Sequence, residues 1–277
     1  MTDKDITLIV VDTYAHELSR LAIERTLSTL PCREVVVFSD RNIYPDGHWI
    51  RTNPLTIDDY NLIMIKNLWP HVVTEHALVI QYDGMAVNPA AWTDQFLDYD
   101  YIGAVWPWPH HNADSKVGNG GFSLRSKRLL DTLKHDNFNF IPNTLRNEDL
   151  YIGVFYKQWL QSQGIVYPSV DVAQQFSHEH HPGYRPSFGF HGSFNVPYFL
   201  NDRDAEQFVR LTPDRLSEGA QMMIIHFFLA GRDDLGHMAL DLARQHSDDF
   251  DQRISRTVKL VDGADQHPFI FSTFCKP

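Results

Sequence analysis

The chain has 277 residues, of which 43% are hydrophobic and 21% are charged, a composition typical of globular proteins with a substantial buried core. Its formal net charge of −11 argues against a general nucleic-acid binder, because no basic surface would neutralise the phosphates. Its two cysteines, Cys32 and Cys275, are far apart in the sequence, so no disulfide framework is predicted.

The first forty residues have the order of elements that begins a nucleotide-binding sheet. Residues 6–11 are a continuous apolar and β-branched run, which predicts a strand buried on both faces. A helix follows, and residues 34–38 predict a second buried strand. Thr13 and Tyr14 come after the first strand and Asp40 after the second, at the edge where ligands bind in such sheets. We therefore expect all three to contact the base and ribose of a nucleotide.

A helix is expected from Asp58 or Asp59 to Trp69, before the third strand of the predicted sheet. Lys66 lies on this helix and is a candidate phosphate ligand. A solvated surface lysine is the alternative interpretation.

Three segments then follow in an informative order. The apolar run at residues 77–80 predicts a buried strand that leads into Gln81-Tyr82-Asp83-Gly84 and presents an Asp at the carboxyl edge of the sheet. A glycine-dense segment occupies residues 118–126, and an acidic helix start occupies residues 147–153. Together they indicate a site where a metal ion, a sugar and a general base meet.

These segments resemble glycosyltransferases of the GT-A type. They are most similar to a bacterial family with Gln-x-Asp-Gly, Asp-Tyr-Ile-Gly-Ala and Gly-Asn-Gly-Gly-Phe-Ser-Leu-Arg-Ser segments, which here are residues 81–84, 100–104 and 118–126. Residues 148–153 also resemble the Glu-Asp-Val-Tyr-x-Gly segment of β-1,3-galactosyltransferases and Fringe-like enzymes. The resemblance covers residues 5–195, and its specificity comes from the order of the motifs.

The resemblance implies an α/β fold of the GT-A type, Rossmann-like, with a mixed and largely parallel sheet. We expect residues 1–200 to form the catalytic core and residues 201–277 to form a helical extension packed on it within one domain. The implied activity is transfer of a hexose-like sugar from a nucleotide diphosphate-sugar to a glycan or lipid-linked acceptor, with Mn²⁺ or Mg²⁺ as cofactor. In bacteria such enzymes often build surface polysaccharide.

Asp83 and His191 are the metal ligands that the resemblance implies. An Asp-x-Asp motif usually holds the metal in GT-A enzymes, and here Gln81 replaces its first Asp and is expected to bind a ribose or phosphate. A simple turn at Asp83 and an ordinary core or surface role for His191 are the alternatives. Residues 178–181 (His-Glu-His-His) lack the spacing of a helical zinc pair and are interpreted as a loop.

Asn119, Gly120 and Gly121 are candidate sugar-binding residues, because a backbone without side chains lets a sugar approach closely. A tight hairpin at this Asn-Gly pair is the alternative. Trp106 begins the aromatic segment Trp106-Pro107-Trp108-Pro109, which can serve as a stacking platform for sugar rings or as a packed lid.

Asp149 is the candidate general base. An inverting transfer requires a carboxylate that deprotonates the acceptor hydroxyl as it attacks the anomeric carbon. A helix N-terminus favours ionised Asp149, so its proton affinity is expected to come from partial burial or from the acceptor complex. Glu148 is expected to position the acceptor. The alternative is a helix start capped by Asn147, with two acidic residues in its first turn.

Two other functions remain compatible with the sequence. One is a catalytically inactive module that binds a sugar or nucleotide, which the missing first Asp favours. The other is a metal-dependent hydrolase built on residues 178–191. The polar N-terminus and the absence of an apolar run of about 18 residues predict a cytoplasmic protein with at most peripheral membrane contact.

Overall fold

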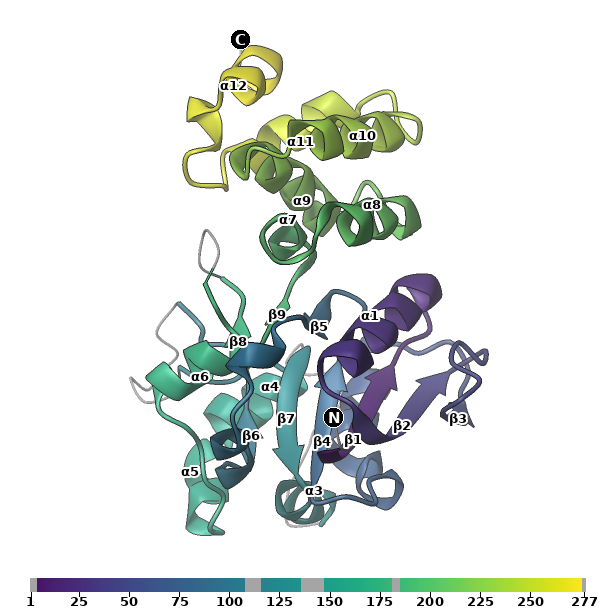
Figure 1. Ribbon diagram of the computed structural model, residues 1–277, viewed down its shortest axis with the longest axis vertical. Helices are drawn as coiled ribbons and strands as arrows, with labels where there is room; N and C mark the ends of the chain where they lie inside the picture. Colours follow the sequence, from purple (N-terminus) through teal and green to yellow (C-terminus); the bar gives the residue numbers. More distant parts are fainter. Residues whose placement is uncertain (1–3, 108–115, 136–146, 181–184, 276–277) are drawn as a thin grey trace. The chain divides into compact units, whose positions relative to one another are not determined.

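The computed structural model describes residues 4–107, 116–135, 147–180 and 185–275 (Figure 1). The chain divides into two compact units, Met1–His191 and Gly192–Pro277. The expectation that the C-terminal residues pack on residues 1–200 as one domain stays a prediction.

A mixed, largely parallel sheet forms the centre of the first unit. Among the described residues it has six strands in the order β3-β2-β1-β4-β7-β6. Strands β3, β2, β1 and β4 are parallel to one another, whereas β7 is antiparallel to β4 and to β6. The strands are β1 (Lys4–Val11), β2 (Cys32–Ser39), β3 (His48–Arg51), β4 (His76–Ile80), β6 (Tyr101–Ile102) and β7 (Phe122–Ser126). The predicted α/β class and sheet type are confirmed.

The continuous apolar runs of the sequence become the central strands because both faces of the sheet are covered. All five residues of β4 are buried, and so are the last six of β1. One face packs against the helical segment after β3 and against α3. The core on this face includes Ile9, Val11, Val36, Phe38, Met64, Leu68, Val79 and Leu130.

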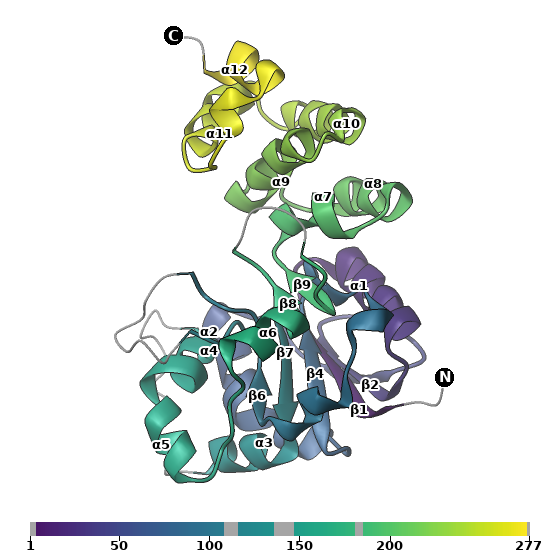
Figure 2. The same ribbon diagram turned by 60° about the vertical axis from the view of Figure 1, so that its left-hand side comes forward.

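The helical elements of the first unit connect these strands (Figures 1 and 2). The α-helices are α1 (His16–Thr29), α2 (Ile57–Leu62), α3 (Lys127–Lys134), α4 (Glu148–Leu150), α5 (Lys157–Ser162) and α6 (Val170–Phe176). The π-helices are η1 (Ile63–Asn67) and η5 (Tyr151–Phe155), and the 3₁₀ helices are η2 (Trp69–His71), η3 (Pro89–Ala91) and η4 (Asp94–Asp98). The expected helix at 58–69 begins one residue earlier, because Thr56 and Asp59 form a capping box.

The acidic helix start after residue 147 does not continue as one regular α-helix. The backbone N–H of Tyr156 donates to the carbonyl of Tyr151 at 2.9 Å, five residues back, so a π turn separates α4 from α5. The extra residue in this turn rotates the chain, and Phe155 is exposed.

A small second sheet brings distant segments of the first unit together. Its strands are β5 (Gly84–Ala86), β8 (Ser177–His178) and β9 (Gly189–His191), in the order β5-β9-β8. Strand β9 is antiparallel to β5 and parallel to β8. Because β5 follows Asp83, β8 precedes Glu179 and β9 ends at His191, the pairing places these three residues near one another.

The second unit is helical, as predicted. Its elements are η6 (Ser193–Asn195), α7 (Val196–Phe199), α8 (Asp202–Leu211), α9 (Glu218–Leu229), α10 (Asp233–Arg244), α11 (Phe250–Val258), η7 (Ala264–Gln266) and α12 (Pro268–Phe274). Helix α9 is buried over most of its length and is capped by the Ser217 side chain, which accepts from the backbone of Ala220. None of the helices in the described part of the chain is long and apolar enough to span a bilayer.

Candidate functional site

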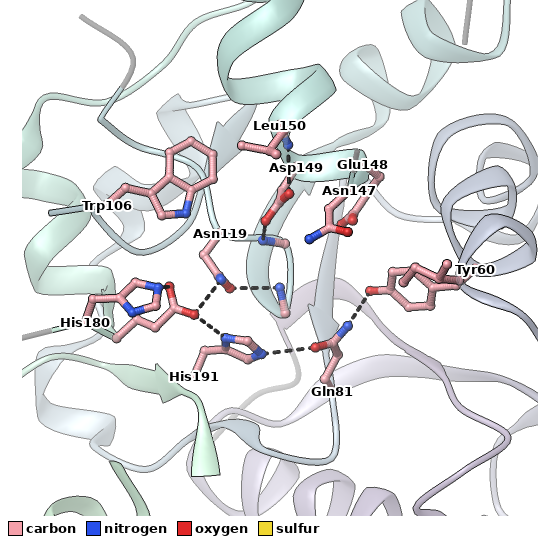
Figure 3. A pocket seen from close by; sticks show the side chains of 14 residues that line it. Tyr60, Gln81, Trp106, Asn119, Asn147, Glu148, Asp149, Leu150, His180 and His191 are labelled. Atoms are coloured by element: carbon pink, nitrogen blue, oxygen red, sulfur yellow. Dashed lines mark hydrogen bonds and ion pairs between the residues drawn. The ribbon is translucent and has the colours of Figure 1, made fainter. Parts of the chain in front are cut away.

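Two cavities lie where β1 and β4 end, and they share Ile57, Tyr60 and Gln81. The larger has a volume of about 460 Å³ and the smaller about 250 Å³. The larger is also lined by Trp106, Asn119, Gly120, Gly121, Asn147, Glu148, Asp149, Leu150, Glu179, His180 and His191 (Figure 3). The smaller is also lined by Val11, Asp12, Thr13, Tyr14, Leu55, Thr56 and Tyr82.

The smaller cavity is shaped by the turn from β1 into α1. The Asp12 carboxylate accepts hydrogen bonds from the backbone of Tyr14 at 3.1 Å and of Ala15 at 3.0 Å. The Tyr14 side chain is 55% exposed, and its ring centroid lies 6.1 Å from that of Tyr82. Thr13 accepts from the backbone of Leu55 at 2.9 Å, which ties the cavity wall together. Two aromatic rings thus border a cavity at the expected nucleotide position.

Asp40, Lys66 and Asp83 line neither cavity in the described part of the structure. The Asp40 carboxylate pairs with His16 at 2.6 Å. The Lys66 ammonium donates to the carbonyls of Leu133 and His135 at 2.9 and 2.8 Å, at the end of α3. The ammonium therefore binds carbonyl groups at the end of α3. The position of Lys66 on its own helix did not indicate this contact, because the carbonyl groups belong to residues far away in the sequence.

A chain of hydrogen bonds crosses the larger cavity (Figure 3). Gln81 Nε2 donates to the Tyr60 hydroxyl at 2.8 Å, and Gln81 Oε1 lies 3.0 Å from His191 Nε2. His191 Nδ1 lies 2.7 Å from Glu179 Oε1, which also accepts from Asn119 Nδ2 at 2.7 Å. The five side chains come from distant parts of the first unit and fix one another's orientation.

Asp83 and His191 have the donor atoms of a divalent-cation site. His191 Nε2 lies 3.4 Å from Asp83 Oδ1 and faces the Gln81 oxygen as well. Although burial alone lowers the pKa of His191, Asp83 and Glu179 raise it well above the usual value. A positive charge is therefore favoured on the His191 ring, and a metal ion bound at Nε2 would have to replace the proton on that atom.

The described residues contain no group of three His, Cys, Asp or Glu side chains arranged to hold a metal. Two protein ligands still fit Mn²⁺ or Mg²⁺, since such ions often take their other ligands from phosphates and water.

The glycines at the cavity floor make room for its polar side chains. A Cβ on Gly120 would lie 2.0 Å from Glu148 Oε1, and one on Gly121 would lie 2.1 Å from His191 Nε2. Neither glycine has the positive φ that an Asn-Gly hairpin turn needs, so the tight hairpin is not formed. Trp106 is buried, and its indole occupies the space beside Gly118. Trp108 and Pro109 lie outside the described residues.

Glu148 is held by a buried ion pair. Its Oε1 accepts from Arg125 Nη2 at 2.8 Å, and Arg125 is fully buried. The Glu148 backbone N–H donates to Asn61 Oδ1 at 3.1 Å, whereas Asn147 makes no side-chain capping bond to this helix. The capping by Asn147 that the alternative interpretation required is therefore absent, and a contact from α2 holds the acidic segment instead.

Asp149 has the environment of a proton acceptor near neutral pH. Its two oxygens accept from the backbone of Gly120 at 3.1 Å and of Leu150 at 2.7 Å. Burial raises the pKa of Asp149 to about 7, and the charge of Glu148 adds to the rise against these two hydrogen bonds. Burial thus raises the pKa of Asp149 by more than its position at the start of a helix lowers it.

Sequence reasoning missed Tyr60, Glu179 and His180, which all line the larger cavity. Glu179 and His180 belong to the cluster interpreted as a loop, but residues 177–178 form β8, and Glu179 directly follows it. Two hydrogen bonds to His180 and His191 outweigh burial and lower the pKa of Glu179 to about 2. The spacing of these residues excludes a helical zinc pair, but it does not exclude a short strand. That strand is what brings Glu179 to the cavity. His181 lies outside the described residues.

Similar solved structures include three glycosyltransferases. One, involved in glycosylation of the major capsid of PBCV-1, is 14% identical over 74% of this chain and 98% of its own, with a TM-score of 0.46. The mannosyltransferase PcManGT from Pyrobaculum calidifontis, in complex with GDP-Man and Mn²⁺, is 13% identical over 96% and 76%, with a TM-score of 0.40. The galactosyltransferase LgtC is 12% identical over 74% and 94%, with a TM-score of 0.39.

A comparison with curated protein sequences gives no significant match. A family model matches residues 49–191, more than half of the chain, and ends at the same His191 that closes β9. This span contains every residue that lines the larger cavity. The chain therefore belongs to the family described as "Protein of unknown function (DUF5672)".

Proposed function

We propose that the protein is a glycosyltransferase that moves a sugar from a nucleotide diphosphate-sugar to a hydroxyl group of a glycan or lipid-linked acceptor. The observation that carries this proposal is the pair of cavities that share Gln81. One has aromatic rings at its wall, and the other contains a buried carboxylate whose pKa is about 7. A two-part substrate with a base at one end and a sugar at the other matches this division.

The donor nucleotide would occupy the smaller cavity. The exposed ring of Tyr14 and the neighbouring Tyr82 offer stacking surfaces for a base, and Thr13 lies beside them. Asp83 and His191 would hold Mn²⁺ or Mg²⁺ next to Gln81. When bound, this cation would neutralise the charge that develops on the diphosphate leaving group.

The sugar and the acceptor hydroxyl would meet in the larger cavity. Asn119 and the backbone of Gly120 and Gly121 would contact the sugar, with Trp106 at the wall. Asp149 would take the proton of the acceptor hydroxyl while the oxygen of that hydroxyl forms a bond to the anomeric carbon and the bond between that carbon and the diphosphate breaks.

The other two carboxylates that line this cavity are already engaged. Glu148 pairs with Arg125, and Glu179 contacts two histidines and Asn119. Glu148 would therefore position the acceptor, not attack the donor. One carboxylate on the acceptor side supports a single displacement with inversion at the anomeric carbon.

The test combines binding with turnover. Thermal unfolding is measured with UDP, GDP, CMP and TDP compounds, with and without Mn²⁺, because a ligand of the folded state raises the unfolding midpoint. The nucleotide that stabilises the protein most is then offered as nucleotide-sugars, and its release is measured with acceptor present. Stabilisation with turnover is expected. Stabilisation without turnover would identify a binding module, and neither effect would reject the proposal.

A further inference from the structure

Glu179 occupies a specific place behind the expected metal ligand. Its Oε1 lies 2.7 Å from His191 Nδ1, while the other ring nitrogen of His191 lies 3.4 Å from Asp83 Oδ1. Glu179 is buried, and it comes from the residue after β8, whereas His191 ends β9. Because these two strands are paired, the contact is set by the backbone of the small sheet.

The contact determines which nitrogen of His191 can bind a cation. A carboxylate beside Nδ1 keeps a proton on that atom, so a cation that binds His191 would take the place of the proton on Nε2, which faces the oxygens of Asp83 and Gln81. Such a partner also fixes the plane of the ring and makes the ligand nitrogen more basic. Nε2 already points toward Asp83 and the Gln81 oxygen, so the ring is oriented before any cation arrives.

The same oxygen of Glu179 connects the cation position to the sugar side of the cavity. Asn119 Nδ2 donates to it at 2.7 Å, and Asn119 Oδ1 accepts from the backbone N–H of Gly121 at 2.9 Å. Displacing Glu179 would therefore release both the His191 ring and the segment that contains Gly121.

We infer that Glu179 is a positioning residue that orients His191 for binding of a divalent cation and couples that cation to the sugar-binding segment. The inference rests on the proposed function for the identity of the ligands. Glu179 itself does not touch the reacting atoms.

The first experiment measures Mn²⁺ affinity by electron paramagnetic resonance, with Mn²⁺ alone and with Mn²⁺ plus UDP. Glu179→Met removes the acceptor but keeps the side-chain length, and we expect the dissociation constant to rise about 10- to 100-fold. Glu179→Gln keeps an acceptor oxygen and should restore part of that loss. The matched control is Glu24→Gln on α1, where the Glu24 carboxylate pairs with exposed Arg20. The Mn²⁺ affinity of this variant should equal that of the wild type.

Unchanged Mn²⁺ affinity in a folded Glu179→Met protein would overturn the inference, and so would a wild type that binds no Mn²⁺. If Glu179→Met does not fold, ¹⁵N spectra of the wild-type histidine rings with Mg²⁺ decide instead. A proton on Nδ1 of His191 is expected, and a proton on Nε2 would overturn the inference. Binding of Mn²⁺ through His191 without binding of any nucleotide would reject the proposed function but support this role of Glu179.

Discussion

Gln81 Oε1 lies 3.0 Å from His191 Nε2, although 110 residues separate the two in the sequence. The contact exists because Gln81 follows β4 and lies just before β5, which pairs with β9 in the small sheet. Gln81 also reaches Tyr60, at the wall shared by both cavities. An Asp-x-Asp motif would supply a second carboxylate at this position, whereas the uncharged Gln81 links His191 to Tyr60.

Asp149→Asn should lower turnover by about 10²- to 10⁴-fold, the usual contribution of a general base, with little change in donor affinity. The product should have inverted anomeric configuration, which NMR of the wild-type product measures directly. Near-normal turnover of Asp149→Asn, or retention of configuration, would contradict the assignment.

The Asp149→Asn test needs a structural control, because both carboxylate oxygens accept backbone N–H groups and the new amide nitrogen would face a donor. Asp171→Asn is suited to this purpose. Asp171 also lies in the first turn of a helix, α6, but it is exposed and lines neither cavity. It should keep full turnover, and the unfolding midpoints of both variants show whether the fold is intact.

The activity should depend on pH through Asp149. Since its pKa is raised to about 7 and the base acts in its ionised form, kcat/KM should rise with pH and level off above an inflection near 7. Asp149→Asn should lack this inflection. A wild-type profile that is flat between pH 5 and 9 would show that another group limits the reaction.

The raised pKa of Asp149 should also make the stability of the protein depend on pH, in the direction opposite to that of kcat/KM. Between the usual carboxyl pKa of about 4 and the folded value of about 7, the folded state holds a proton that the unfolded state has released. The free energy of unfolding should therefore fall as pH rises through this range, by up to about 1.4 kcal/mol per pH unit. Denaturant unfolding of the wild type and Asp149→Asn at several pH values isolates this contribution, and equal slopes for the two proteins would contradict it.

Asp83→Asn should remove the part of the nucleotide-induced stabilisation that depends on Mn²⁺, because the amide brings no charge to the cation. The part that depends on base stacking beside Tyr14 should remain. Thermal unfolding with nucleotide, with and without Mn²⁺, separates the two parts. Asp46→Asn, in an exposed loop, is the matched control. If Asp83→Asn keeps the full Mn²⁺ effect, the cation binds elsewhere.

Gly121→Ala should weaken Mn²⁺ binding and reduce stability. The new Cβ would lie 2.1 Å from His191 Nε2 and 2.7 Å from Gln81 Oε1, so both side chains must move. Overpacking of this kind typically costs about 1–3 kcal/mol in the free energy of unfolding. Gly219→Ala, in the first turn of α9, meets only the Ser193 hydroxyl at 3.0 Å and should change stability much less. If the two substitutions change the free energy of unfolding by the same small amount, the cavity has room for a side chain at Gly121.

The sequence by itself predicted the elements that depend on local pattern. The apolar runs before Asp12 and before Gln81 required strands buried on both faces, and a strand of that kind presents the next residues at the carboxyl edge of the sheet. For this reason Thr13, Tyr14 and Gln81 could be placed near a cavity without coordinates. Asp149 and Asn119 both line the larger cavity, and their roles there stay predictions.

The distant partners that these residues contact depend on how the chain packs in three dimensions. Lys66 was a candidate phosphate ligand, with a solvated surface lysine as the alternative, and long-range packing of α3 places carbonyl groups beside its ammonium. Glu179 could not be recognised from spacing, because its contact with His191 depends on the pairing of two short strands. The raised pKa of Asp149 likewise depends on burial and on Glu148, which Arg125 and Asn61 hold from other elements. Local pattern fixes the backbone direction of a strand, whereas desolvation and hydrogen bonding are sums over neighbours that only the folded chain brings together.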